Sequence, residues 1–121
     1  MTTSSKTLIS LVVILAVFLG FSFLSNRQAL KPQSILFYGD GCPHCEIVDT
    51  FIKENGIQDK MAFQKLEVFN NPGNASILSE KAAICGLDTK NIGVPFFWDG
   101  SKCYTGDEPI IAFFKQQTGI K

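Results

Sequence analysis

An uncharged apolar run near the N-terminus, Leu8 to Leu24, most constrains how this chain can fold. With its two flanking residues it covers residues 7–25, roughly 28 Å as a helix at ~1.5 Å per residue, which approaches the ~30 Å hydrocarbon core of a bilayer. The run lacks the polar stripe of a helix that packs on a soluble domain. It therefore predicts one transmembrane helix and leaves residues 34–121 to form a single core.

The same run is also compatible with the apolar region of a signal peptide cleaved after Ser22, with Gly20 at the −3 position. Charge does not set the orientation of a spanning helix, because Lys6 precedes the run and Arg27 and Lys31 follow it. The predicted segments are an N-terminal tail (1–6), the transmembrane helix (7–25), a polar linker (26–33) and a folded domain (34–121).

Composition excludes two classes of protein. The chain has 11 basic and 11 acidic residues, which argues against binding nucleic acid by neutralising phosphates. Apolar residues make up 45% of the chain and include 11 Phe, so it is not intrinsically disordered.

The pattern of residues 34–121 predicts an α/β domain with a four-stranded mixed sheet. The dipeptide Asp99-Gly100 predicts a hairpin between the last two strands, and Asn71-Pro72-Gly73 predicts a turn before the second helix. The order is β-α-β-α-β-β-α, with strands over 34–38, 63–69, 95–98 and 102–105 and helices over 43–55, 75–85 and 107–117.

The motif Cys42-Pro43-His44-Cys45 lies where the first strand is followed by the first helix. At the helix N-cap, unpaired backbone N–H groups and the helix dipole stabilise a Cys42 thiolate. Pro43 suits the first helical position, and a protonated His44 adds further stabilisation. Cys45, one turn later, is placed to form a disulfide with Cys42. Because a stable thiolate favours the dithiol form, the disulfide is expected to be oxidising.

An inert disulfide and half of a zinc site are the alternatives for this motif. Zinc sites usually combine two closely spaced pairs of ligands, whereas Cys85 and Cys103 are far apart in sequence and His44 is the only histidine. We therefore expect redox chemistry and no metal or other cofactor.

The segments ILFYGDGCPHC, NIGVPFFWDG and YTGDEPIIAFF together resemble the thioredoxin superfamily, at the size of a glutaredoxin, over residues 34–121. The layout is similar to that of small membrane-anchored bacterial thioredoxin-like proteins. The resemblance implies a cis bond at Val94-Pro95 beside the cysteine pair, with the Val94 backbone binding a substrate peptide. It implies Cys42 and Cys45 as catalytic residues and Pro43 and His44 as residues that tune them.

The chain also departs from the family pattern at several positions. The lysine that usually precedes the motif in glutaredoxins is replaced by an acid, Asp40, and Thr105 replaces a glycine, which disfavours glutathione as a partner. The large helical insertion of CPHC-type disulfide oxidases is missing, as is the tryptophan that often precedes the motif. We expect a membrane-anchored thiol–disulfide oxidoreductase, outside the cytoplasm, whose partners are protein thiols and disulfides or a membrane redox protein. The alternatives are a glutathione-dependent glutaredoxin and a non-enzymatic tethered binding module.

Other residues have two interpretations. Cys85 and Cys103 form either a second disulfide or two buried apolar side chains. Trp98 is expected in the core rather than in a substrate groove. Asp40 and Asp107 are either solvated carboxylates or groups that act near the cysteine pair.

Overall fold

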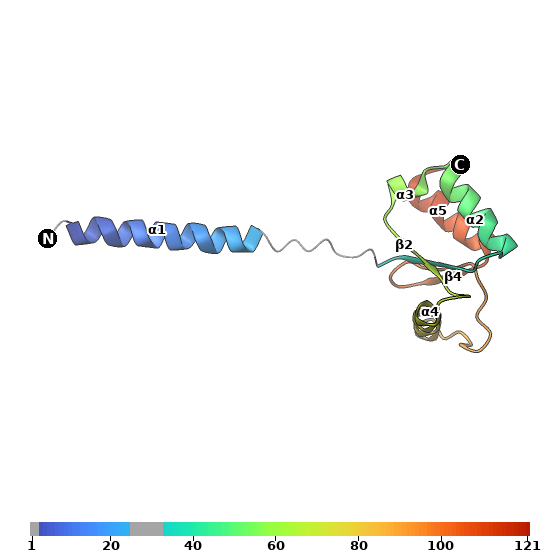
Figure 1. Cartoon of the computed structure of the whole chain (residues 1–121). Coiled ribbons are helices and arrows are strands. Elements are labelled where there is room, and N and C mark those ends of the chain that lie inside the picture. Colours follow the sequence, from blue (N-terminus) through green and yellow to red (C-terminus); the bar gives the residue numbers. More distant parts are fainter. Residues whose placement is uncertain (1–2, 25–32) are drawn as a thin grey trace. The chain divides into compact units, whose positions relative to one another are not determined.

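The computed structural model describes residues 3–24 and 33–121, with side chains for residues 4–20 and 33–121. The chain divides into two compact units, Met1–Lys31 and Pro32–Lys121 (Figure 1). The first unit contains helix α1 (Thr3–Leu24). The second unit contains the sheet, the remaining helices and all four cysteines.

The prediction of a transmembrane helix over residues 7–25 is wrong. Crossing the ~30 Å hydrocarbon core requires about 20 consecutive apolar residues in a helix. Among the residues that the structure describes, no helix reaches the combination of length and apolarity that a bilayer crossing needs. The prediction of a single-pass membrane protein with residues 34–121 outside the cytoplasm depended on that helix, so it is not supported either. The predicted linker lies outside the described residues except for Gln33, and cleavage after Ser22 stays a prediction.

The second unit is an α/β domain built on a four-stranded mixed sheet, as predicted. Its strands lie in the order β2-β1-β3-β4, with β1 parallel to β2 and antiparallel to β3, and β3 antiparallel to β4. In this register Tyr38 lies opposite Glu67, so the chain leaves both strands at the same edge of the sheet. The strands are β1 (Ile35–Tyr38), β2 (Gln64–Glu67), β3 (Phe96–Trp98) and β4 (Cys103–Thr105).

The helices of this unit are α2 (Pro43–Glu54), α3 (Ile57–Lys60), α4 (Pro72–Ile84) and α5 (Asp107–Thr118). Two differences from the predicted elements have local causes. Helix α4 begins at Pro72 instead of at residue 75, because the Asn71 side chain caps it by accepting from Asn74 N at 3.0 Å. The short helix α3 was not predicted; it follows Gly56, whose φ of 57° reverses the chain after α2.

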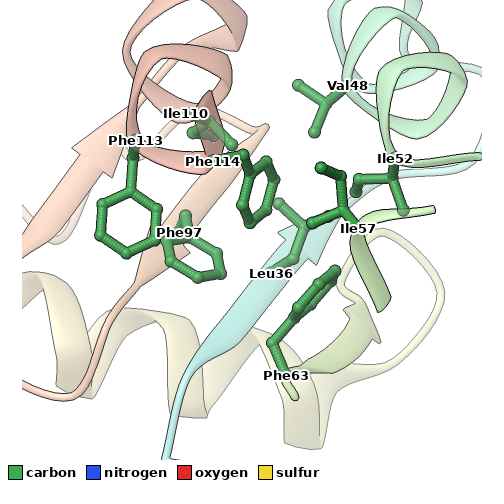
Figure 2. Close-up of a cluster of buried hydrophobic side chains, with 9 residues drawn as sticks. All are labelled: Leu36, Val48, Ile52, Ile57, Phe63, Phe97, Ile110, Phe113 and Phe114. Carbon is green, nitrogen blue, oxygen red and sulfur yellow. The ribbon is translucent and has the colours of Figure 1, made fainter. Parts of the chain in front are cut away.

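Helices cover both faces of the sheet, with α2, α3 and α5 on one side and α4 on the other (Figure 1). Leu36 and Phe97, on neighbouring strands, point to the α2/α5 side and pack in a cluster that includes Phe114, which is fully buried (Figure 2). Phe37 and Phe96 point to the α4 side. This alternation follows from the two-residue period of a strand, and it buries both faces of β1 just before the loop that leads to α2.

Candidate active site

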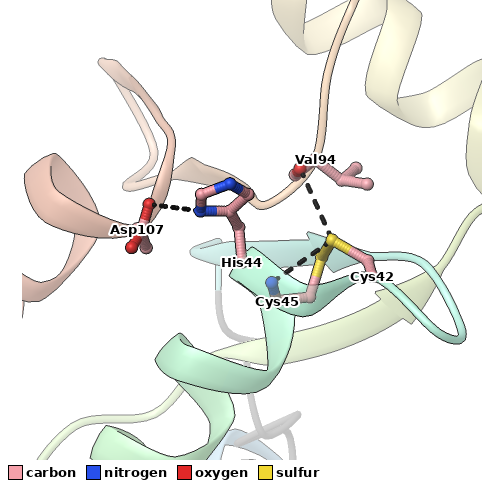
Figure 3. Close-up of polar contacts among 5 residues, drawn as sticks. All are labelled: Cys42, His44, Cys45, Val94 and Asp107. Atoms are coloured by element: carbon pink, nitrogen blue, oxygen red, sulfur yellow. Dashed lines mark hydrogen bonds and ion pairs between the residues drawn. A yellow bond between two sulfur atoms is a disulfide. The ribbon is translucent and has the colours of Figure 1, made fainter.

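The Cys42-Pro43-His44-Cys45 motif forms the first turn of α2. Cys42 is the N-cap, in extended conformation, and Pro43 occupies the first helical position, as predicted. Cys45 N donates to Cys42 Sγ at 3.2 Å (Figure 3). The two cysteines form a disulfide with a Cα–Cα distance of 5.2 Å. The sulfur of Cys42 therefore lies where unpaired helix N–H groups stabilise negative charge.

The two cysteines differ in burial. Cys45 is 6% exposed, whereas Cys42 is only partly buried. The turn that leads to Cys42 is closed by a hydrogen bond from Cys42 N to Gly39 O at 3.3 Å. Within this turn Gly41 has a φ of 73°, which glycine adopts readily. An incoming sulfur nucleophile therefore reaches Cys42 first. Cys45, which is buried behind it, is better placed to attack a mixed disulfide formed at Cys42.

The loop before β3 brings Val94 and Pro95 to this turn. Val94-Pro95 is a cis bond, and the Val94 carbonyl oxygen lies 3.6 Å from Cys42 Sγ (Figure 3). In the dithiol form the Cys42 thiol can donate to that oxygen. Pro95 is fully buried, which anchors the loop on the sheet.

His44 points away from the sulfurs and pairs with Asp107. Its Nδ1 lies 3.1 Å from Asp107 Oδ1, in the first turn of α5 (Figure 3). The His44 side chain is 69% exposed and that of Asp107 is 22% exposed. This pair joins the N-terminal turns of α2 and α5, two segments that the sequence separates widely.

A cavity of about 320 Å³ opens beside the disulfide. Acidic side chains outnumber basic ones around it, so it disfavours an anionic ligand. The residues that line it are Leu36, Tyr38, Gly39, Asp40, Gly41, Cys42, Cys45, Glu46, Asp49 and Lys65. Asp40, interpreted from the sequence as either solvated or active near the cysteine pair, lies at this cavity.

Asp49 connects the cavity wall to two lysines. Hydrogen bonds from Lys53, at 2.6 Å, and from Lys65 hold the pKa of Asp49 below its ordinary value of 3.8. A lowered pKa means that the ionised carboxylate stabilises the folded state. That stability is complete above the ordinary pKa and is lost as the pH falls through the lowered native value.

We expect Asp49→Asn to lower the free energy of unfolding by about 1 kcal/mol at pH 7, since its ion pairs are only partly shielded from water. The difference from the parent chain should disappear in acid, below the native pKa of Asp49. Urea unfolding at pH 7 and at a series of pH values falling below 3.8 measures how the deficit changes with pH. A deficit that stays constant over this range would mean that lost packing, and not lost charge, causes the effect.

Cys85 and Cys103 form a second disulfide, with a Cα–Cα distance of 6.3 Å, between the end of α4 and β4. Both pack against the buried cluster on the α4 side of the sheet, as do Ile92 and Val94. Trp98 is 7% exposed and belongs to the same cluster, so it is a core residue.

Sequence reasoning missed Glu67 and Phe69 as neighbours of the site. The Phe69 ring lies against Gly39, so closely that a Cβ at Gly39 would overlap it. The parallel pairing of β1 and β2 implied this neighbourhood, but the pairing was not known from the sequence. In the two described stretches of the chain, no cluster of three or more His, Cys, Asp or Glu side chains is placed to hold a metal ion.

No protein-family model, curated protein sequence or solved structure matches this chain. The small α/β domain and its cysteine pair are compatible with a thioredoxin-like fold. The pair at this spacing is also compatible with thiol–disulfide chemistry.

Proposed function

We propose that residues 34–121 form a thioredoxin-like thiol–disulfide oxidoreductase that exchanges disulfides with protein thiols through Cys42 and Cys45. One observation carries the proposal: the disulfide lies at the N-terminus of α2, with Cys42 only partly buried and Cys45 buried. An inert disulfide needs neither the helix N-terminus nor this difference in access.

In the oxidising direction, a substrate thiolate attacks Cys42 Sγ and breaks the Cys42–Cys45 bond, and Cys45 leaves as a thiolate. A second substrate thiolate then attacks the substrate sulfur of the mixed disulfide and releases the Cys42 thiolate. The substrate gains a disulfide, and the protein takes up two electrons. In the reducing direction, the Cys42 thiolate attacks a substrate disulfide and Cys45 resolves the mixed disulfide.

The residues around the sulfurs support this chemistry. The N–H groups of the first turn of α2 stabilise the Cys42 thiolate as it leaves or attacks. The backbone of Val94, beside Cys42, can pair with an extended substrate segment. Glutathione fits less well, because carboxylates of Asp40, Glu46 and Asp49 surround the adjoining cavity and glutathione is an anion.

The experiment that tests the proposal is a redox titration of the full chain in glutathione buffers, with thiols alkylated and counted by mass spectrometry. A two-thiol transition that disappears in Cys42→Ser supports the proposal. A potential above about −200 mV indicates an oxidase or isomerase, and one near −270 mV indicates a reductase. If Cys42 and Cys45 show no transition, the non-enzymatic binding module is favoured instead.

We expect His44→Ala to shift the reduction potential of the Cys42–Cys45 pair to more negative values by roughly 30 mV, equivalent to about 1.4 kcal/mol. The protonated form of the His44 imidazole stabilises a Cys42 thiolate, so its removal destabilises the dithiol form. The same titration measures the shift. Ile47→Ala, which changes a 47% exposed side chain of α2, is the matched control. An unchanged potential in His44→Ala would exclude a tuning role for His44.

A further inference from the structure

We propose that Phe69 is a specificity-determining residue of this site, which binds an apolar side chain next to the reactive cysteine of an extended protein substrate. The proposal rests on the proposed function, because it concerns the substrate of the Cys42–Cys45 pair.

The first observation is that Phe69 is exposed where other aromatic residues of the domain are buried. Its side chain is 61% exposed, whereas Phe63, at the other end of the same β2 segment, is 7% exposed. A phenyl ring that stays in water contributes no free energy of burial to folding. A partner that covers the ring gains that free energy on binding.

The second observation is that the loop carrying Phe69 is held in place. Glu67 Oε1 accepts from Phe69 N at 2.7 Å and from Asp40 N at 3.3 Å, and Oε2 accepts from Asn70 N at 2.9 Å. Asn70 Nδ2 in turn donates to Asp40 Oδ2 at 3.3 Å. These bonds tie the loop after β2 to the loop after β1, so little conformational entropy remains to be lost when the ring binds a partner.

The third observation places the ring against the turn that leads to the reactive cysteine. The Phe69 ring occupies the space over Gly39 that a Cβ would need. Gly39 O accepts from Cys42 N, which closes a four-residue turn. The ends of such a turn lie within about 7 Å of each other, measured between Cα atoms.

The separation between Phe69 and Cys42 indicates which part of a substrate can contact the ring. An extended chain advances about 3.3 Å per residue, so side chains one or two positions from a cysteine bound to Cys42 reach the neighbourhood of Phe69. The backbone of Val94, which lies beside Cys42 on the loop before β3, suits an extended segment. A small disulfide such as hydroxyethyl disulfide reaches Cys42 without covering the ring. A substrate with an apolar residue at one of these positions covers it.

The test uses the reduced full chain and two peptide disulfides of identical sequence except at the two positions flanking the cysteine, which carry Leu in one and Ser in the other. Each reaction oxidises the Cys42 and Cys45 thiols to a disulfide and reduces the peptide disulfide to two thiols. We expect the second-order rate constant to be about 5- to 10-fold higher for the Leu peptide, the size of effect of one well-placed aromatic contact.

Phe69→Ser should reduce that preference to below 2-fold and leave the rate with hydroxyethyl disulfide within 2-fold of the parent chain. Phe69→Leu should keep most of the preference, and Ile84→Ser, at a 59% exposed position on α4, should keep all of it. Retention of the preference in Phe69→Ser, or a parallel loss with both peptides and hydroxyethyl disulfide, would overturn the proposal. A parent chain that reduces hydroxyethyl disulfide without any peptide preference overturns this inference alone. A parent chain that reduces no disulfide overturns the proposed function with it.

Discussion

Cys42→Ser is expected to abolish disulfide exchange by the chain, whereas Cys45→Ser is expected to accumulate a mixed disulfide with the substrate. Cys42 is the sulfur at the N-cap that an incoming thiolate or disulfide reaches, so its loss removes the first step. Cys45 is 6% exposed, and in its absence no internal thiol is placed to resolve the intermediate. The measurement is exchange with a peptide disulfide, followed by mass spectrometry of the intact protein under non-reducing conditions.

The expected mass increase in Cys45→Ser equals one substrate chain, and dithiothreitol should remove it. Cys42→Ser/Cys45→Ser is the control, and it should trap nothing. A mixed disulfide that forms at Cys85 or Cys103 in that control would contradict the assignment of the reactive pair.

The second large effect concerns stability. Cys85→Ala/Cys103→Ala is expected to lower the free energy of unfolding by about 3 kcal/mol, because the disulfide closes a loop between residues 18 apart in sequence and restricts the unfolded chain. The enclosed segment includes the Val94 loop, and both cysteines pack against the same buried cluster as Val94. Urea unfolding of the oxidised full chain, monitored by Trp98 fluorescence, measures the change.

Cys42→Ala/Cys45→Ala is the matched control for this experiment. It removes a disulfide between residues only 3 apart, for which the loop-closure contribution is smaller. A loss in Cys85→Ala/Cys103→Ala no larger than in this control would show that the second disulfide does not act as a constraint on the unfolded chain.

The cysteine motif illustrates what local sequence could predict. Pro43 restricts φ to a helical value and lacks an N–H, so it marks the first position of a helix, and the preceding Cys42 is then the N-cap. The continuous apolar run of the third strand assigned Trp98 to a core, where it is 7% exposed. These predictions were correct because the interactions responsible span only a few residues.

Local hydropathy was insufficient for the N-terminal segment. The run over residues 7–25 predicted a transmembrane helix, and no described helix meets the requirements for one. The segment is nonetheless helical in α1, and a helical conformation is a separate property from the capacity to cross a bilayer.

The sequence by itself determined the chain order of the strands and of every helix of the domain except α3, the position of Cys42 at a helix N-terminus and the mixed character of the sheet. Tertiary structure decided the pairing of His44 with Asp107, the second disulfide and the placement of Phe69 against Gly39. The physical reason is the range of the interactions. Capping and strand alternation act between near neighbours in the chain, whereas these contacts exist only after β1, β2 and the helices pack into one domain.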